Sequence, residues 1–553
     1  MKQSIIIILF LGFVFQINAQ TPRNPMPRTI NIPSKNHISP SLSGDGKHMV
    51  YVSNYSTSNK MVLKYSYLDE NDQWSEPLEI TTVSKTELDV LGGHWLTYDG
   101  SLLFFTSKRS PGIGQYDIFF SERKGRYWTP AQNVGKPVNS EGNEGHPSLS
   151  PDGRYLYFMR CNEMDNYKVD GCELFVAERK SDNYWHEPKR LPNPINTGNE
   201  ASPRIMPDGE TLVFASKRPG GKGGFDLYQS RFKNGNWSAP VACDYLNTDQ
   251  DDHFISVPAH GKLAYFSTIF RGYHTIIEAQ IPEQLQPKKV VLAQGKVLES
   301  STGKPLDAVI QVYNARTRER DQFIKVKPDG TFFVLVKGDD IYDFSITTRE
   351  NKHVYFSKLY DLRDLQQSLI EDLSVTLSPI TNGYTLVADD ILFQPLSSSI
   401  QPTSEVALLR LAKFLRDNPG YKLDIGVYLD EYKTDTIPGD PDLSEVITDT
   451  VWTEVPIPSY LESHLIDSLT IDSLNLYTID TVYETTYAFD LNYTYHNDRT
   501  PAQAQAIYDK LLSLGVPPHL ITATGYSDQK KRSTYYEPSF GHSNTWVEIK
   551  LVR

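Results

Sequence analysis

The chain has 553 residues and a net charge of −13. This length predicts three or four domains, each large enough to hold a core. The acidic balance argues against nucleic acid as a partner, because its recognition needs a basic patch. Aromatic residues make up 12% of the chain, including 33 tyrosines, which suits β-rich packing.

The N-terminus has the features of a secretory signal peptide. Lys2 precedes an apolar segment at 5–15, and Ala19 supplies the small residue expected at a cleavage site. We assign 1–19 to the signal peptide, which is too short to span a membrane. No cysteine near the cut can carry a lipid anchor, and no later segment is long and apolar enough to cross a membrane. We therefore expect an exported protein that is not a lipoprotein, with a short N-terminal segment at 20–37.

Residues 38–283 contain an internal repeat. A tight-turn motif ends at Gly46, Gly100, Gly153, Gly209 and Gly261. A tryptophan closely followed by proline recurs in phase at Trp74, Trp128, Trp185 and Trp237. Steps of roughly 52 to 56 residues with short strands indicate the blades of an all-β propeller. We expect five blades, with a sixth closed by 20–37 as the alternative.

Three carboxylates, Glu144, Glu200 and Asp252, each stand nine residues before a turn glycine. Equivalent positions of a propeller converge on its axis, so these carboxylates are candidate contacts for a cation or a basic partner loop. The structural alternative, which we favour, has them accept hydrogen bonds from turn amides and link neighbouring blades. The histidines of the repeat stand at differing offsets, so we expect no metal site there. These are His37, His94, His146 and His253.

Cys161 and Cys172 bracket a loop of the third repeat. An exported protein can hold a disulfide, and closing so short a loop stabilises by roughly 3 kcal/mol in the chain-entropy model. A zinc site needs four ligands, and no histidine or second cysteine pair flanks this loop. We therefore predict a disulfide between them and a buried, inert Cys243.

Two resemblances follow from these motifs and from the next segment. The turns, with the SKR and YDI or FDL strands that follow them, resemble TolB-type, WD-repeat-like propellers of Bacteroidota envelope proteins. Residues 290–379 read as a small β-sandwich with turns at Gly295, Gly303 and Gly330. This segment resembles the carboxypeptidase regulatory-like domain, an immunoglobulin-like spacer with no catalytic residues of its own.

Residues 383–553 mix helix and strand. An amphipathic helix is expected near Leu408 and Leu415, and a second helix is expected to begin with Thr500 as N-cap and Gln503 closing a capping box. The order β-α-β-α-β resembles the OmpA-like, peptidoglycan-associated domain, interrupted by an insert at 431–498. The insert holds 14 acidic residues against one basic residue. We expect it to form an acidic hairpin or extended arm, or else a solvated loop.

In the OmpA-like family an Asp and an Arg clamp the diaminopimelate of peptidoglycan, since a zwitterion needs one charge of each sign. Asp430 occupies the place of that Asp, but Gln503 stands where the Arg belongs. Arg499, one helical turn upstream, is the candidate substitute. The family's terminal Asn-Arg-Arg is replaced from Asn544 onward. This departure favours protein contact over retained peptidoglycan binding.

No catalytic motif appears: no Gly-x-Ser-x-Gly elbow, no zinc helix and no phosphate loop. We therefore expect a non-enzymatic protein without a cofactor. The domain order resembles PorE-type components of the Bacteroidota type IX secretion machinery. That resemblance implies a periplasmic scaffold or adaptor peripheral to the outer membrane. Its expected partner is an outer-membrane barrel of the PorP/SprF kind or another envelope subunit, with peptidoglycan as a further ligand.

Two alternatives remain open. A carbohydrate-binding or glycan-sensing propeller protein predicts aromatic pairs at the propeller mouth. An enzyme predicts a compact cluster of titratable residues in the central channel.

Overall fold

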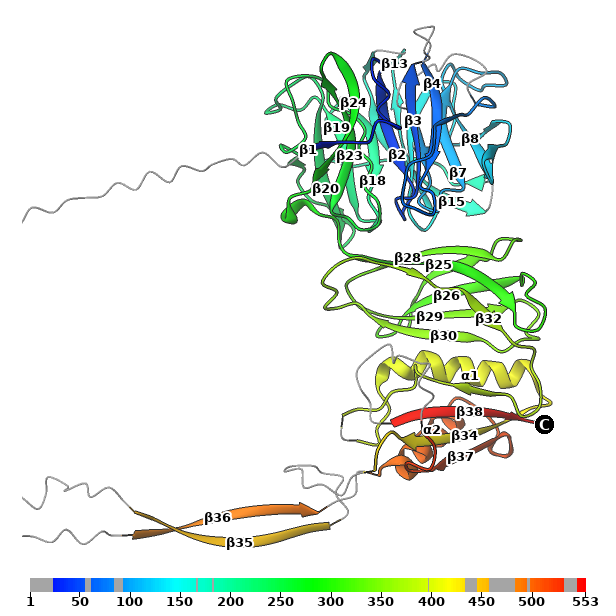
Figure 1. The fold of residues 1–553 in the computed structure, drawn as a ribbon, viewed down its shortest axis with the longest axis vertical. Coiled ribbons are helices and arrows are strands. Elements are labelled where there is room, and N and C mark those ends of the chain that lie inside the picture. The colour runs from blue at the N-terminus through cyan, green and yellow to red at the C-terminus, as the bar shows by residue number, and fades with distance from the viewer. Residues whose placement is uncertain are drawn as a thin grey trace, which may run out of the picture. The chain divides into compact units, whose positions relative to one another are not determined.

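The computed structural model describes residues 23–54, 61–83, 93–165, 168–181, 184–395, 397–432, 445–456, 483–494, 498–531 and 545–553. In 445–456 and 483–494 only the backbone is described. The predicted signal peptide, most of the acidic insert and Asn544 lie outside these residues. No helix within them is long and apolar enough to cross a membrane. Strands dominate the fold (Figure 1).

The chain divides into two compact units. Unit 1 comprises residues 1–307, 324–340 and 361–376, and unit 2 comprises 308–323, 341–360 and 377–553. The segment predicted as one sandwich, 290–379, is thus shared between the two units.

Most of unit 1 consists of antiparallel sheets that follow one another along the chain, which we number 1 to 5. Sheet 1 holds β2 (His37–Leu42), β3 (His48–Asn54), β4 (Met61–Tyr67) and β5 (Leu78–Glu79). Sheet 2 holds β6 (His94–Leu96), β7 (Leu102–Ser107), β8 (Asp117–Lys124), β9 (Tyr127–Trp128) and β10 (Gln132–Asn133). Sheet 3 holds β11 (Asn143–Leu149), β12 (Tyr155–Cys161), β15 (Glu173–Ser181), β16 (Tyr184–Trp185) and β17 (Lys189–Arg190).

Sheet 4 holds β18 (Glu200–Ile205), β19 (Thr211–Ser216), β20 (Asp226–Lys233), β21 (Asn236–Trp237) and β22 (Val241–Ala242). Sheet 5 holds β23 (Leu263–Phe270), β24 (Tyr273–Gln280) and β1 (Arg23–Pro25). A small hairpin of β13 (Glu163–Met164) and β14 (Val169–Asp170) extends from sheet 3. Because β1 pairs antiparallel with β24, the N-terminal strand completes the last sheet of the series.

The repeated turn explains why each sheet begins with a tight hairpin. In sheet 1, Asp45 accepts hydrogen bonds from the Ser43 hydroxyl at 2.5 Å and from the Lys47 amide at 3.0 Å. Gly46 then takes a φ of +73°, a conformation that costs glycine little because it has no Cβ. The turn glycines of the other repeats also have positive φ.

A β-bulge interrupts the first strand of several sheets at one position of the repeat. Pairing shifts register beside Ser39 in sheet 1, His146 in sheet 3 and Ser202 in sheet 4. Each of these residues has a positive φ, which is uncommon outside glycine. A bulge re-aims the side chain that it carries.

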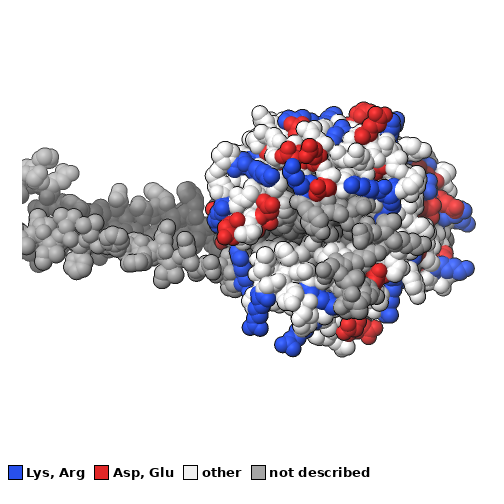
Figure 2. Space-filling view, turned by 90° about the horizontal axis from the view of Figure 1, so that it is seen from above, with Lys and Arg blue, Asp and Glu red and all other residues white. Residues whose placement is uncertain are grey.

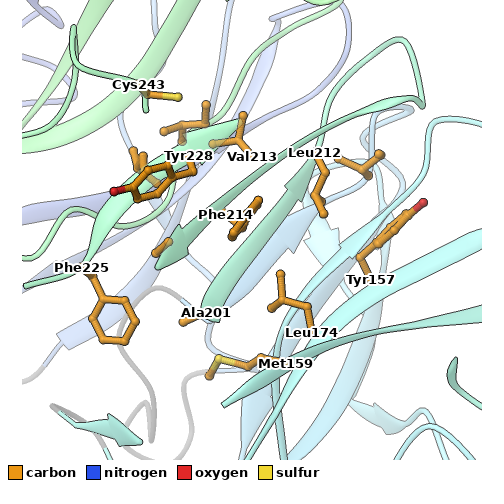
Figure 3. Close-up of a cluster of buried hydrophobic side chains, with 14 of the residues drawn as sticks. Tyr157, Met159, Leu174, Ala201, Leu212, Val213, Phe214, Phe225, Tyr228 and Cys243 are labelled. Carbon is orange, nitrogen blue, oxygen red and sulfur yellow. The ribbon is translucent and has the colours of Figure 1, made fainter. Parts of the chain in front are cut away.

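The hydrophobic core of unit 1 lies largely between neighbouring sheets. Figure 3 shows Leu174, Phe214 and Leu212 among the side chains that fill the space around sheets 3 and 4, and all three are fully buried. Cys243 is buried in the same cluster, and burial raises the pKa of its thiol to about 12. A thiol with that pKa is protonated and unreactive at neutral pH, as predicted for this residue.

Unit 1 also contains part of the segment that follows the repeat. After η1 (Glu283–Leu285), β28 (Thr331–Lys337) pairs with β25 (Val290–Glu299), and β31 (Leu369–Asp372) runs parallel to β25. Val290 and Leu292 share a buried cluster with Tyr98 of the second repeat. Lys337 also forms an ion pair with Glu210 at 3.0 Å. β32 (Val375–Leu377), at the end of this segment, pairs with β25 as well.

The described residues of unit 2 form two larger sheets and two α-helices. One sheet has the order β27 (Arg320–Lys325), β26 (Ala308–Asn314), β29 (Ile341–Thr348), β30 (Phe356–Asp361). The other has the order β33 (Thr385–Val387), β38 (Thr545–Val552), β34 (Lys422–Leu429), β37 (Ile521–Gly525), with β34 and β37 parallel. The helical elements are η2 (Pro402–Ser404), α1 (Glu405–Asp417), α2 (Thr500–Ser513) and η4 (Pro518–Leu520). Within the insert, β35 (Glu445–Pro456) and β36 (Tyr483–Thr494) form an antiparallel hairpin.

The two helices test the sequence interpretation differently. Leu408 and Leu415 of α1 are buried, as their helical spacing predicted. The predicted capping box of α2 is wrong, because Thr500 lies inside the helix and Arg499 is the N-cap. Asp498 instead accepts the Thr500 hydroxyl at 2.6 Å, and the Gln503 amide donates to the carbonyl of Ser397 at 3.2 Å.

Candidate functional site

A polar cluster forms where the bulged strands of sheets 3 and 4 meet the segment before sheet 5. The Ser202 hydroxyl lies 2.9 Å from Nδ1 of His146 and 3.0 Å from Nδ1 of His253. The three residues come from successive repeats, and two of them occupy the bulge. We call this set, together with His94 and Arg204, the polar cluster.

Arg204 occupies a buried position in the polar cluster. Its guanidinium donates to the carbonyls of Pro147 at 3.0 Å and His94 at 2.9 Å. Its charge also lies about 5 Å from the ring centres of Trp95 and Phe254, at 5.2 Å and 5.1 Å. Burial lowers the pKa of Arg204 to about 9, so the group remains a cation at neutral pH.

The histidines of the polar cluster are neutral at physiological pH. Burial, aided by the charge of Arg204, lowers the pKa of His94 to about 3. Burial also lowers the pKa of His253 to about 4 and that of His146 well below its usual value. A serine beside a neutral histidine is the pairing of an activated nucleophile. Ser202, however, is 1% exposed, so the described geometry gives a substrate no access to its hydroxyl.

The enzyme alternative predicted a compact set of titratable residues in the central channel. The polar cluster is a compact set, but most of its members are buried. Among the residues that the structure describes, no group of three His, Cys, Asp or Glu side chains is placed to hold a metal ion. With its members buried and hydrogen-bonded to one another, the cluster has the contacts of a packed polar core. Its arrangement supports packing between repeats better than it supports binding.

An open site lies instead between sheets 2 and 3. A cavity of about 300 Å³ is lined by side chains of both sheets, which we call the groove. Its lining residues are Leu102, Phe104, Phe120, Glu122, Gln132 and Val134 of sheet 2 and its edge, and Arg179 and Trp185 of sheet 3. This volume is at the lower end of the range for small-molecule sites, which combine apolar walls with a few polar groups.

Arg179 and Trp185 form one wall of the groove. The Arg179 guanidinium lies 4.7 Å from the centre of the Trp185 ring and also donates to the carbonyl of Gly153 at 2.8 Å. Phe104 and Phe120 form a tilted pair on sheet 2, with ring centres 5.9 Å apart. The rings of the groove come from both sheets, but Trp185 is 8% exposed and Phe104 is 3% exposed, so the half-buried Phe120 is the more accessible ring.

The tryptophans equivalent to Trp185 in the neighbouring repeats are packed differently. Trp128 of sheet 2 meets Tyr65 of sheet 1 edge to face at 5.8 Å, and Trp237 of sheet 4 meets Tyr157 of sheet 3 at 6.5 Å. Phe120 occupies the place in the repeat that Tyr65 occupies in sheet 1. Trp185, in contrast, stacks on no aromatic ring of the described residues, and the groove occupies the space beside it.

The three predicted carboxylates each accept hydrogen bonds within their own repeat. Glu144 is fully buried and accepts the amide of Ser140 at 2.9 Å and Nε of Arg160 at 2.8 Å. Glu200, also fully buried, accepts the amide of Thr197 at 2.8 Å.

The third carboxylate, Asp252, is half-buried and accepts the amide of Thr248 at 2.5 Å. Burial raises the pKa of Asp252. In all three repeats the carboxylate thus accepts a backbone amide three or four residues earlier, as the structural alternative predicts. The link between neighbouring blades, which that alternative also predicts, is not made by these side-chain bonds.

The remaining predicted residues lie in sheet 3 and in unit 2. A disulfide joins Cys161 to Cys172. Asp430 follows β34 and is exposed, and Arg499 precedes α2. Ser527 forms hydrogen bonds with the chain neighbours of both residues. Its carbonyl accepts the amide of Leu429, which precedes Asp430, and its amide donates to the hydroxyl of Thr500, which follows Arg499. Gln503 is 4% exposed, and its Oε1 has no partner among the described residues.

Sequence reasoning missed both the polar cluster and the groove. The differing offsets of the histidines predict no shared site, yet His146 and His253 both lie within hydrogen-bond distance of the Ser202 hydroxyl. The groove had a weak signal, because Trp185 looks equivalent to Trp128 and Trp237 in sequence. Only the packing of the facing sheet distinguishes it.

No family model matches the chain, and no curated protein matches it. Solved structures to which the chain shows similarity include a glycoside hydrolase, with 13% identity and a TM-score of 0.33, covering 48% of this chain and 94% of its own. An endo-arabinase from Bacteroides thetaiotaomicron has 16% identity and a TM-score of 0.31, with coverages of 47% and 97%. A thermostable family-43 glycoside hydrolase has 11% identity and a TM-score of 0.32, with coverages of 46% and 92%.

These comparisons correct two predictions. The structures found are named as carbohydrate-active enzymes, which contradicts the predicted scaffold or adaptor function and the prediction that the chain is not an enzyme. Neither prediction is retained. The barrel partner and the periplasmic localisation stay predictions.

Proposed function

We propose that this chain is an exported carbohydrate-binding protein whose groove between sheets 2 and 3 holds a glycan. The observation that carries the proposal is the unfilled cavity beside Trp185, at a place where the neighbouring repeats pack a tryptophan against a tyrosine. A sugar ring has an apolar C–H face that packs on an aromatic ring. Its hydroxyls both donate and accept hydrogen bonds.

The polar residues of the groove fit those hydroxyls. Arg179 supplies donors, Glu122 supplies acceptors and the Gln132 amide supplies both. Because Glu122 and Arg179 bring one charge of each sign, the lining favours an uncharged sugar over a strongly acidic one. Elsewhere, Figure 2 shows acidic and basic side chains interspersed on the face that it draws.

The finer architecture belongs to the same proposal. Sheets 1 to 5 share the repeated turn, and β1 completes sheet 5, which supports a five-bladed propeller. The β-α-β-α-β order of unit 2 and the parallel pair β34 and β37 support an OmpA-like domain. The sheets formed by β25 to β32 fall in different units, so the carboxypeptidase regulatory-like sandwich stays a prediction.

Export is supported by the signal-peptide features and by the disulfide of sheet 3, since disulfides persist in oxidising compartments. An OmpA-like domain makes peptidoglycan a second proposed glycan, with Asp430 and Arg499 as its contacts beside Ser527. The groove and this second site are separate, so each can be tested alone.

A glycan microarray probed with the purified mature chain tests the proposal. We expect retention on a defined set of uncharged glycans, lost in Trp185→Ala and kept in Trp237→Ala, the matched tryptophan outside the groove. No retention on any glycan would contradict the proposal. Equal retention by both variants would show that glycan binds elsewhere than the groove.

A further inference from the structure

A second cavity lies within unit 2, between α1 and the sheet β27-β26-β29-β30. Its volume is about 190 Å³, and we call it the helix cavity. It is distinct from the groove, which belongs to unit 1. An engineered apolar cavity of about 150 Å³ accepts a benzene molecule, so this space is large enough for a six-membered ring with a short substituent.

The inner wall of the helix cavity is aromatic and rigidly held. Tyr355 and Phe414 pack edge to face with ring centres 6.2 Å apart. The Arg410 guanidinium lies 5.3 Å from the centre of the Tyr355 ring. Arg410 is in turn fixed by ion pairs to Asp343 and, at 2.7 Å, to Asp390. These contacts hold the Tyr355 ring in place before any ligand arrives.

The buried charge of Arg410 does not make the cavity cationic. Asp343 and Asp390 supply two carboxylates against its one guanidinium, and both are almost fully buried. These carboxylates raise the pKa of Arg410, and burial raises the pKa of Asp343. The inner end of the cavity therefore selects for shape and apolar surface rather than for an anion.

The rim of the helix cavity carries accessible cations. The Lys413 side chain is 64% exposed and pairs with Asp417 at 2.7 Å, and Arg318 is 53% exposed and pairs with Glu405 at 2.9 Å. Exposed pairs of this kind are weak, so each cation can take a second anion without a large loss. Leu409, which is 41% exposed, adds an apolar group to the same rim.

A buried hydroxyl gives an independent indication of a ligand. Thr348 lines the helix cavity and is 5% exposed, and its Oγ1 has no hydrogen-bond partner among the described residues. Buried polar groups are almost always paired, and leaving one unpaired is costly.

We propose that the helix cavity binds a small aromatic carboxylate. The ring enters between Tyr355, Phe414 and Leu409, and the carboxylate stays at the rim with Lys413 and Arg318. The ligand matches the size of the space and its aromatic wall, and its carboxylate meets two exposed cations, Lys413 and Arg318, whose pairs with Asp417 and Glu405 carry no net charge. This inference does not depend on glycan binding in the groove.

Calorimetric titration of the full mature chain with 3-phenylpropionate tests the inference. We expect saturable binding at one site. The affinity for 3-phenylpropanamide, which keeps the ring and lacks the charge, should be about fivefold lower. Lys413→Gln should lower the affinity for the carboxylate by a similar factor and leave the affinity for the amide unchanged. Lys352→Gln is the matched control, because Lys352 is also an exposed, paired lysine but does not line the cavity.

Leu409→Trp fills the mouth of the cavity from an exposed position and should abolish binding while the far-ultraviolet circular dichroism stays unchanged. The inference would be overturned by absence of saturable binding to the wild-type chain. Equal affinity for the acid and the amide, or undiminished binding by Leu409→Trp, would overturn it as well.

Discussion

The polar cluster and the groove are built from the same repeat, yet side chains fill the first and leave a cavity in the second. In the polar cluster, His146, Ser202 and His253 from successive repeats bond to one another and leave the central hydroxyl 1% exposed. In the groove, Trp185 and the Phe104–Phe120 pair leave a cavity of about 300 Å³. Titratable residues gathered in one place therefore do not by themselves mark a binding site. A gap left by otherwise regular packing is the better indication here.

Lowering the pH should have the largest effect, because it destabilises the folded chain through the buried histidines of the polar cluster. The unfolded imidazole has a pKa near 6.5, while burial holds the pKa of His94 at about 3 and that of His253 at about 4. The unfolded chain then binds more protons, so stability is fully present above about pH 6.5 and is lost as the pH falls. Between pH 7.5 and 5 we expect a loss of about 2 kcal/mol for each histidine.

Urea denaturation followed at several pH values measures this loss. His94→Gln should remove about a third of the pH-dependent loss that the three histidines of the polar cluster contribute. A profile that stays flat in the wild-type chain would show that these histidines are not buried in the neutral form. Glycan binding should show none of this dependence as long as the chain stays folded.

Replacing the tightly packed tryptophan should cost more than replacing the one in the groove. Trp128 is 7% exposed and contacts Tyr65 edge to face, so Trp128→Ala removes both buried area and a ring pair. We expect a loss of about 3 to 4 kcal/mol in the free energy of unfolding, measured by chemical denaturation. A loss below about 1 kcal/mol would contradict the packing described for sheets 1 and 2.

Trp185 is 8% exposed, almost as buried as Trp128, but it meets no aromatic ring of the described residues and lies beside the groove, so Trp185→Ala should cost less, about 2 kcal/mol. The same denaturation experiment measures it beside Trp128→Ala. If the two variants lose equal stability, Trp185 is packed as tightly as Trp128, which would contradict the contrast drawn between the groove and its neighbours.

Filling the groove should have the smallest effect on stability. Phe120→Trp adds ring atoms toward the cavity, at the repeat position that Tyr65 occupies in sheet 1. We expect a change below about 1 kcal/mol in either direction, since added contacts offset strain. Glycan affinity should nevertheless fall at least tenfold. Unchanged affinity in titration calorimetry would place the ligand outside the groove.

Much of the β-rich fold was predictable from local chemistry. The turn glycines and the phased tryptophans indicate repeated antiparallel sheets, because the turn needs a positive φ and the tryptophan packs behind it. The spacing of Leu408 and Leu415 likewise predicts the buried face of α1. The absence of the predicted capping box at Gln503 was not predictable, because Asp498 competes for the Thr500 hydroxyl and Arg499 becomes the N-cap of α2.

The sites depend on distances between repeats, which no local pattern contains. His146 and His253 differ in their offset from the turn, and only a bulge with positive φ brings both to Ser202. In the same way, Trp185 differs from Trp128 only through what faces it across the sheet interface. The helix cavity joins residues about 100 positions apart, such as Gln311 and Lys413, which share no sequence motif.

The most direct test of the account is titration calorimetry of a glycan retained on the array against three chains: wild type, Trp185→Ala and Trp237→Ala. The account predicts that Trp185→Ala lowers the affinity at least tenfold, while Trp237→Ala binds within twofold of the wild type. Equal affinity in all three chains, with each variant folded, would contradict the assignment of the groove as the glycan site.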